Sequence, residues 1–258
     1  MKHCYILVIM LMQLPAWAQE QTSETDKPPL ITDRPDQTES AFVVPVRTLQ
    51  LETEVKLGWE NRNLTTLDYN SSLLRIGLSR LAELRISQEY QRQQREVENK
   101  KSVLSGIGPL TVGTKISMWN EKGLRPQAAL ILDYVLPTGS QELREGETDR
   151  YLVRGLFSHS LTDKVGMGYN LGGAYYGRGD YRLIYTFAVS RALTDKLGAY
   201  VEVFGEKEAA SSANLSADGG ITCLLLYNLQ LDLSGGVGVT ENAERGYVSA
   251  GFSWRFPY

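Results

Sequence analysis

The stretch "LQLETEVKLGWE", residues 49–60, decides the fold because its side chains alternate between two faces. One parity carries the apolar residues Leu49, Leu51, Val55, Leu57 and Trp59, with Thr53 among them. The other parity carries the polar residues Gln50, Glu52, Glu54, Lys56 and Glu60. A period of two predicts a β-strand with one buried face. The alternation alone leaves open whether the apolar row faces a protein core or lipid.

The same alternation recurs along the rest of the chain. About twelve such segments, each bounded by turn residues, cover residues 48–59, 67–79, 82–93, 106–118, 125–137, 150–160, 164–177, 180–191, 196–207, 214–227, 229–240 and 246–257. Short connections such as residues 161–164 and 193–196 alternate with longer polar ones such as residues 91–102 and 137–149. This pattern predicts an all-β, up-and-down antiparallel barrel with both ends on the short-turn side.

The charged parity indicates which way this barrel faces. A closed sheet of about twelve strands is wider than the eight-stranded size that side chains can fill, so a soluble version would have to be a two-sheet sandwich. In lipid, the same sheet pairs every backbone group by closure and keeps its charges in a wet lumen. We therefore predict a transmembrane β-barrel. Its lumen-lining candidates are Glu52, Glu54, Lys56, Arg75, Arg85, Glu89, Lys115, Asp133, Arg154, Arg182, Glu202 and Asp232.

Two segments carry apolar residues on the predicted lumen parity. These residues are Ile131, Val135, Leu152 and Leu156. They would either pack against a plug inside the barrel or form an apolar lining for a solute. The alternation is compatible with both interpretations.

The first 18 residues have the pattern of a secretory signal peptide. A basic start at Lys2 and His3 precedes an apolar run over residues 5–14, and "AWA" at residues 16–18 fits a cleavage site. The run is too short to cross a bilayer as a helix. We expect residues 19–46 to form a polar periplasmic segment and residues 47–258 to form a barrel in the outer membrane of a Gram-negative bacterium. The expected partners are outer-membrane lipid, lipopolysaccharide and the barrel assembly machinery.

Composition excludes several classes of function. The net charge of -3 gives no general attraction for nucleic acid. After removal of the signal peptide only Cys223 remains, which excludes an intrachain disulfide. His159 is then the only histidine, and its neighbours Ser158 and Ser160 point to the opposite face of a strand. The sequence therefore predicts no metal site, no cofactor and no enzyme activity.

Residues 31–46, "ITDRPDQTESAFVVPV", form a charged, proline-containing element just before the first strand. Asp33, Arg34, Asp36 and Glu39 would either fold into the barrel mouth as a plug that pairs with lumen charges, or form a surface turn at the periplasmic rim. Both interpretations stay open from the residues alone.

Residues 31–60, "ITDRPDQTESAFVVPVRTLQLETEVKLGWE", resemble the opening of a family of exported bacterial barrels related to the phenol meta-pathway degradation protein, especially its Bacteroidetes members. The resemblance rests on "TDRPD" and "TES" within residues 32–40 and extends to the final strand, "GFSWRFPY". It implies an outer-membrane β-barrel with a transport role. It implies no catalytic residues and no particular solute.

The leading interpretation is a passive outer-membrane channel or transporter for a small solute. Charges of both signs in the lumen would either pair as salt bridges or line a diffusion path. The residues predicted to contact solute are Arg154 and Arg182, with Glu54, Glu202 and Asp232 as counterparts. The alternatives are a non-conducting structural or adhesive surface barrel, acting through residues 91–102 and 137–149, and a less favoured outer-membrane lipid hydrolase.

Overall fold

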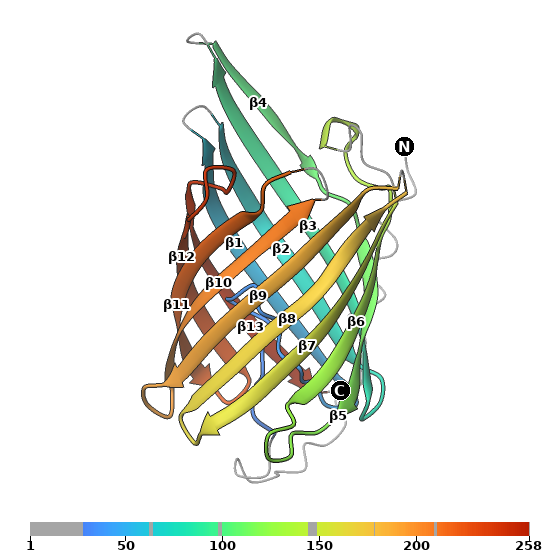
Figure 1. Ribbon diagram of the computed structural model, residues 1–258, viewed down its shortest axis with the longest axis vertical. Coiled ribbons are helices and arrows are strands. Elements are labelled where there is room, and N and C mark those ends of the chain that lie inside the picture. Colours follow the sequence, from blue (N-terminus) through green and yellow to red (C-terminus); the bar gives the residue numbers. More distant parts are fainter. Residues whose placement is uncertain are drawn as a thin grey trace.

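The alternating segments form one closed antiparallel sheet in the computed structural model (Figure 1). The structure describes residues 28–61, 64–97, 100–143, 149–177, 179–208 and 211–257. The predicted signal peptide, residues 1–18, and residues 19–27 lie outside the described residues. The strands are β1 (Thr48–Asn61), β2 (Leu64–Gly77), β3 (Ala82–Val97), β4 (Lys100–Ile107), β5 (Thr111–Trp119), β6 (Gln127–Val135), β7 (Arg150–Thr162), β8 (Val165–Tyr176), β9 (Tyr181–Ala192), β10 (Leu197–Glu208), β11 (Asn214–Leu226), β12 (Leu229–Gly238) and β13 (Gly246–Pro257), with a short 3-10 helix, η3 (Gln141–Leu143).

Pairing between successive strands closes the ring. β1 pairs with β2 on one side and with β13 on the other. β3 pairs with β4 over its second half and with β5 over its first half, so β4 and β5 together act as one interrupted strand. The predicted all-β, up-and-down barrel of about twelve strands is thereby confirmed.

The interruption between β4 and β5 lies at Pro109. Proline has no backbone N–H and cannot donate to a strand ladder. On either side of it, the Gly108 N–H donates to the Glu89 carbonyl at 3.0 Å and the Leu110 N–H donates to the Thr138 hydroxyl at 3.0 Å. The unbroken segment predicted over residues 106–118 is therefore wrong at this point.

The hairpin formed by β3 and β4 extends well beyond the neighbouring strands (Figure 1). The sequence analysis assigned residues 91–102 to a loop, but the described part of this range belongs to the two strands. Arg92, Arg95 and Lys101 are exposed there. Because polar residues occupy both parities over residues 91–96, no apolar row reveals a strand there.

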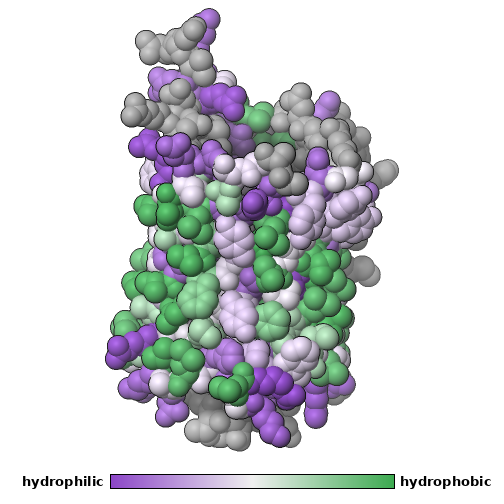
Figure 2. All heavy atoms as spheres, viewed as in Figure 1, coloured by the Kyte–Doolittle hydropathy of each residue, from purple (hydrophilic) through white to green (hydrophobic). Residues whose placement is uncertain are grey.

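The two faces of the barrel wall differ in chemistry. Glu52 in β1 has no exposed surface, whereas Val55 on the opposite parity is 47% exposed. Arg75, Glu83 and Lys115 are also fully buried on the inside. Figure 2 shows the outer face of the barrel, with apolar side chains across the middle and polar ones above and below. This distribution is typical of a barrel that crosses a membrane.

No helix among the described residues is long and apolar enough to span a membrane.

Candidate functional site

Residues 28–47, which we call the inner segment, occupy the lumen near the short-turn ends of the strands. In Figure 1 they are the blue trace that lies behind β8 and β9. At the start of the segment, the Arg255 guanidinium of β13 donates to the carbonyl of Pro29 at 2.8 Å. At its end, the Arg47 N–H donates to the Gly77 carbonyl at 3.1 Å, just before β1. The inner segment therefore begins and ends at the same rim of the barrel and bends through the lumen between these points.

Asp33 is the most heavily bonded carboxylate of the inner segment. Its oxygens lie 2.7 Å from Lys115 Nζ, 2.6 Å from Arg85 and 3.3 Å from Arg75. Burial alone would raise the pKa of Asp33, but Arg75, Lys115 and Arg85 outweigh it and hold that pKa well below its usual range. Asp33 is therefore an anion that neutralises a cluster of wall cations.

The wall beneath Asp33 is itself a buried ion-pair network. The Arg75 guanidinium lies 2.9 Å from Glu52 and 2.8 Å from Glu83. The Asp33 backbone N–H donates to Glu52 at 2.9 Å, and the Val44 N–H donates to Glu83 at 2.7 Å. Charges without exposed surface are tolerated only when they are paired and hydrogen-bonded. Both the wall and the inner segment supply those partners.

Arg34 and Glu39 attach the inner segment to further strands. Arg34 lies 2.7 Å from Glu54 of β1 and 3.0 Å from Asp232 of β12. Glu39 lies 2.6 Å from Arg85 and also accepts a hydrogen bond from Arg154 of β7. The four charged residues predicted for the N-terminal segment thus do not behave alike, since Asp33, Arg34 and Glu39 form ion pairs with the wall.

A small apolar contact also holds the inner segment against the barrel wall. Ala41 of the inner segment is fully buried together with Ala129, Ile131 and Leu156 of β6 and β7. The apolar residues on the lumen parity of these two strands therefore face the inner segment here. Of the two alternatives that the sequence left open for Ile131 and Leu156, the structure shows a packed contact with the N-terminal segment.

On the side that faces β9 to β11, the inner segment is held by hydrogen bonds to the wall. The Gln37 N–H donates to Glu202 of β10 at 2.7 Å. The Thr38 hydroxyl lies 2.7 Å from the Thr186 hydroxyl of β9 and donates to Glu202. No arginine or lysine of the described chain lies within ion-pair distance of Asp36 or Glu202. Burial and the neighbouring Glu202 carboxylate raise the pKa of Asp36 well above its usual range.

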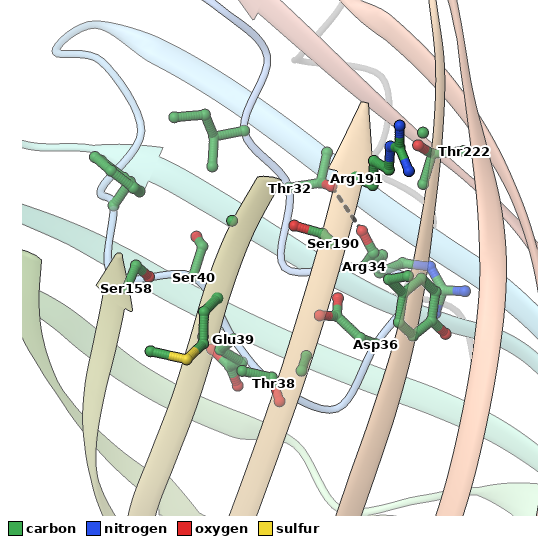
Figure 3. A pocket seen from close by; sticks show the side chains of 18 of the residues that line it. Thr32, Arg34, Asp36, Thr38, Glu39, Ser40, Ser158, Ser190, Arg191 and Thr222 are labelled. Carbon is green, nitrogen blue, oxygen red and sulfur yellow. Dashed lines mark hydrogen bonds between the residues drawn. The ribbon is translucent and has the colours of Figure 1, made fainter. Parts of the chain in front are cut away.

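Cavities remain above and below this side of the inner segment. A cavity of about 460 Å³ lies towards the short-turn ends and is lined by Thr38 and Ser190, among others. Figure 3 looks into it and shows residues 32–40 along one side and Ser158, Ser190 and Thr222 on the wall strands. A second cavity, of about 350 Å³, lies towards the long-loop ends and is lined by Gln37 and Arg154, among others. Neighbouring residues of the inner segment, Thr38 and Gln37, thus border the two cavities.

The predicted lumen residues divide into two groups. Those that contact the inner segment are Glu52, Glu54, Arg75, Arg85, Lys115, Arg154, Glu202 and Asp232. The others lie apart from it. Lys56 pairs with Glu244 at 3.0 Å, Asp133 lies 3.7 Å from Arg154, and Glu89 lines a small cavity of about 150 Å³.

The residues predicted to contact solute are not brought together. Arg154 pairs with Glu39, whereas Arg182 pairs with Glu206 at 2.8 Å and with Glu208 at 2.5 Å towards the long-loop rim. Their predicted counterparts Glu54, Glu202 and Asp232 all bond the inner segment instead. The sequence analysis had no means of assigning these pairs, because they join strands far apart in the chain.

Two lumen-facing residues with polar contacts were not predicted. Asn170 of β8 accepts from the Glu39 N–H at 2.8 Å and donates to its carbonyl at 3.0 Å. Asp218 of β11 accepts a hydrogen bond from the Tyr247 hydroxyl of β13. Both lie on the polar parity of their strands, so alternation was the signal that could have found them.

Nothing in the described chain has the geometry of a hydrolase or a metal centre. His159 Nδ1 lies 3.7 Å from Glu121, and no hydrogen bond joins it to a serine of the described residues. No group of three or more histidine, cysteine, aspartate or glutamate residues in the described ranges is arranged to hold a metal ion.

Known structures with a similar fold are outer-membrane channels and porins. An outer-membrane channel from Pseudomonas putida F1 aligns with a TM-score of 0.66 at 11% identity, over 84% of this chain and 98% of that one. The KdgM porin, solved with disordered oligogalacturonate, gives 0.53 at 12% identity, over 81% and 99%. The NanC porin gives 0.51 at 8% identity, over 80% and 98%. At such identities the likeness concerns the fold.

No curated protein matches the sequence. The family model described as "Putative MetA-pathway of phenol degradation" matches residues 32–256, which is most of the chain and includes nearly all of the inner segment and the barrel. The chain therefore belongs to the phenol meta-pathway degradation family of β-barrel proteins.

Proposed function

We propose that this protein is a passive outer-membrane channel for a small solute and that the inner segment closes its lumen. We call the arrangement described above, in which the inner segment is bonded to the wall, the docked state. The observation that carries the proposal is the bonding of Asp33, Arg34 and Glu39 to charged side chains of the wall. Residues 1–18 direct export, and the apolar outer face contacts outer-membrane lipid and lipopolysaccharide after insertion by the barrel assembly machinery.

The cavities on either side of the inner segment support a channel for small solutes. Their volumes, about 460 and 350 Å³, are in the range of pockets that hold small molecules. Passage between them requires that residues 35–40 move away from the wall. Because the inner segment is attached by discrete ion pairs and hydrogen bonds, such a movement is a shift between a docked and an undocked population.

A second candidate function is a non-conducting surface barrel. The observation that favours it is the hairpin of β3 and β4, which reaches beyond the neighbouring strands and exposes Arg92, Arg95 and Lys101 (Figure 1). A projecting charged hairpin would suit adhesion or a structural role at the cell surface. Measurement of conductance separates the two candidates directly.

Deletion of residues 19–40 tests the channel. The deletion removes the charged part of the inner segment and keeps residues 41–47, which lead into β1. We expect the refolded variant to show discrete conductance steps in planar bilayers that are larger or more frequent than those of the processed chain. A matched control removes a segment of the β3 and β4 hairpin outside the lumen, and its conductance should equal that of the processed chain.

The outcomes separate three cases. Raised conductance in the deletion variant alone supports a channel closed by the inner segment. Equal conductance in the processed chain and the variant contradicts closure by the inner segment but supports a channel. Silence of both proteins contradicts the channel and supports the surface barrel.

A further inference from the structure

The lumen charges are distributed unevenly around the inner segment. On the side of β1 to β7, its carboxylates Asp33 and Glu39 pair with arginine or lysine, as the contacts above show. On the side of β10 and β11, Glu202 lies directly opposite Asp218 across the strand pair, and the N–H of Gln37, which follows Asp36 in the chain, donates to Glu202. We call the carboxyl groups of Asp36, Glu202 and Asp218 the acidic gap.

No basic side chain of the described residues forms an ion pair with the acidic gap. A lysine in its surroundings, Lys56, is committed elsewhere, since it pairs with Glu244 at 3.0 Å and lies 4.5 Å from the centre of the Tyr247 ring. Carboxylates in a narrow space of low dielectric repel one another unless a cation joins them or they take up a proton. No arginine or lysine of the described wall and inner segment supplies that cation by an ion pair.

Unsatisfied polar atoms point to the same place. Tyr200 of β10 is 7% exposed, and its hydroxyl and that of Ser234 are buried without a hydrogen bond of regular geometry in the described chain. Tyr200 lies two residues from Glu202, on the same face of β10, and lines the first cavity together with Asp36. One carboxylate oxygen of Asp218 is likewise buried without a hydrogen bond. Buried polar atoms without partners are rare, and those in one spot call for a partner other than the described side chains, such as water or an ion.

The acidic gap also lies beside the residues that border both cavities described above. Thr38 lines the cavity on the short-turn side, and Gln37, its neighbour in the chain, lines the cavity on the long-loop side. Tyr200 lines the first cavity together with Asp36. Glu202 accepts hydrogen bonds from both Gln37 and Thr38. Displacement of residues 37 and 38 from Glu202 would join the cavities through the acidic gap.

We infer that solute passes between residues 37–38 and strands β9 to β11, and that the acidic gap makes this route selective for small monovalent cations, organic or inorganic. The inference rests on the proposed channel function. Carboxylates and a tyrosine hydroxyl offer oxygen acceptors to a cation and repel an anion. The described residues do not form a cage for a tightly bound metal ion, which suits weak binding that permits release.

The route is tested with a variant that weakens the bonds of the inner segment to β9 and β10 and leaves its other bonds to the wall in place. Thr38→Ala removes the hydroxyl that bonds Thr186 and Glu202. Ser40→Ala is the matched control, because it removes a hydroxyl of the same segment that bonds Asp33 on the opposite side. In planar bilayers Thr38→Ala should conduct severalfold more than the processed chain, and Ser40→Ala should not.

Selectivity is then measured in the Thr38→Ala background under a gradient of potassium chloride. The reversal potential should show preference for potassium over chloride. Adding Glu202→Gln and Asp218→Asn keeps the hydrogen-bond acceptors but removes two charges, and the permeability ratio should fall severalfold towards unity. Adding Glu208→Gln removes one charge at the long-loop rim and should leave the ratio unchanged.

Each outcome decides the inference. A conducting 19–40 deletion variant beside a silent Thr38→Ala variant keeps the channel but overturns this route. A conducting Thr38→Ala variant without cation preference, or with a preference that survives loss of both carboxylates, overturns the acidic gap as its cause. Silence of the deletion variant as well overturns the proposed function itself. Cation preference lost only with Glu202 and Asp218 supports the inference.

Discussion

Two aspartates of the inner segment, Asp33 and Asp36, lie in opposite electrostatic settings. Asp33 is surrounded by Arg75, Arg85 and Lys115, which hold its pKa well below the usual range. Asp36 is buried beside Glu202, which raises its pKa well above that range. A lowered carboxyl pKa means that the docked state favours the anion, and a raised one means that it favours the neutral acid.

Asparagine at these two positions should therefore act in opposite directions. Asp33→Asn removes an anion shared by the buried wall cations and leaves Lys115 with Glu39, 3.9 Å away, as its nearest ion-pair partner among the described residues. It should weaken docking by about 3–5 kcal/mol, the usual cost of breaking a buried pair. Asp36→Asn removes repulsion from Glu202 and should strengthen docking. Open probability in planar bilayers should rise for Asp33→Asn and fall for Asp36→Asn. The same direction of change in both variants would contradict the charge assignment.

The pH dependence of opening follows from Asp36. A carboxyl group with a raised docked-state pKa stabilises the docked state at low pH, and this contribution is lost as the pH rises through the raised value. Asp33 stabilises the docked state as an anion, so its contribution is lost as the pH falls. Because its docked-state pKa is lowered, this loss occurs below the ordinary aspartate pKa of about 3.9. The titratable groups around Asp36 are Glu202 and Tyr200 of β10, Asp218 of β11 and Asp33 of the inner segment itself.

Open probability should therefore increase as the pH rises from about 4, near the ordinary aspartate pKa, towards neutrality. Single-channel recordings over this range give the slope, and Asp36→Asn should reduce it. A channel that opens more readily in acid, or an Asp36→Asn variant with an unchanged slope, would show that Asp36 does not bias docking.

At the scale of the strands, alternation predicts nearly everything that lies in the membrane. The segments expected over residues 164–177 and 196–207 correspond to β8 (Val165–Tyr176) and β10 (Leu197–Glu208). The signal is strong there because one face meets lipid and the other meets water. It fails at Pro109, where the ladder breaks, and over residues 91–96, where polar residues occupy both parities.

The outer part of the β3 and β4 hairpin should be dispensable for the barrel. In β3, residues 82–87 pair with β5 and close the ring. The outer part pairs with β4 and also with β2, but the β2 residues opposite residues 93–95, residues 64–66, keep their pairing with β1 when the outer part is removed. Because Arg92 lies opposite Ser105, residues 93–104 can be replaced by Asn-Gly, which forms a tight two-residue turn.

This shortened variant should keep the heat-dependent gel mobility of a folded barrel and an unchanged conductance. The control is a second shortened hairpin of the same length in which the register between β3 and β4 is shifted by one residue. Such a shift moves every side chain of a strand to the opposite face. Loss of folding in the Asn-Gly variant would show that the outer hairpin stabilises the ring.

At the scale of the whole molecule, the position of residues 28–47 depends on contacts that sequence patterns do not encode. Asp33 meets Arg75, Arg85 and Lys115 because the barrel closes around it, and nothing in "TDRPD" distinguishes this from a turn at the rim. The same limit explains why Arg154 and Arg182 could be placed in the wall but not matched to their partners. Alternation assigns a side chain to a face, whereas pairing across the lumen depends on the closed shape.

Closure of the lumen by the docked inner segment is the central claim, and a reversible crosslink tests it most directly. The hydroxyls of Thr38 and Thr186 lie 2.7 Å apart, so cysteine thiols at both positions are expected to lie close enough to be joined by an S–S bond of about 2.05 Å. Cys223, the free cysteine of the described chain, is replaced by serine in the same variant and alone in the control.

The measurement is the conductance of the Thr38→Cys, Thr186→Cys, Cys223→Ser variant in planar bilayers before and after addition of a reductant. With the disulfide formed, the inner segment is fixed in the lumen and the channel should be silent. After reduction it should conduct, because the bonds of the Thr38 hydroxyl are also gone, while the Cys223→Ser control should not respond to the reductant. Equal conductance with the disulfide formed and reduced would contradict closure by the inner segment.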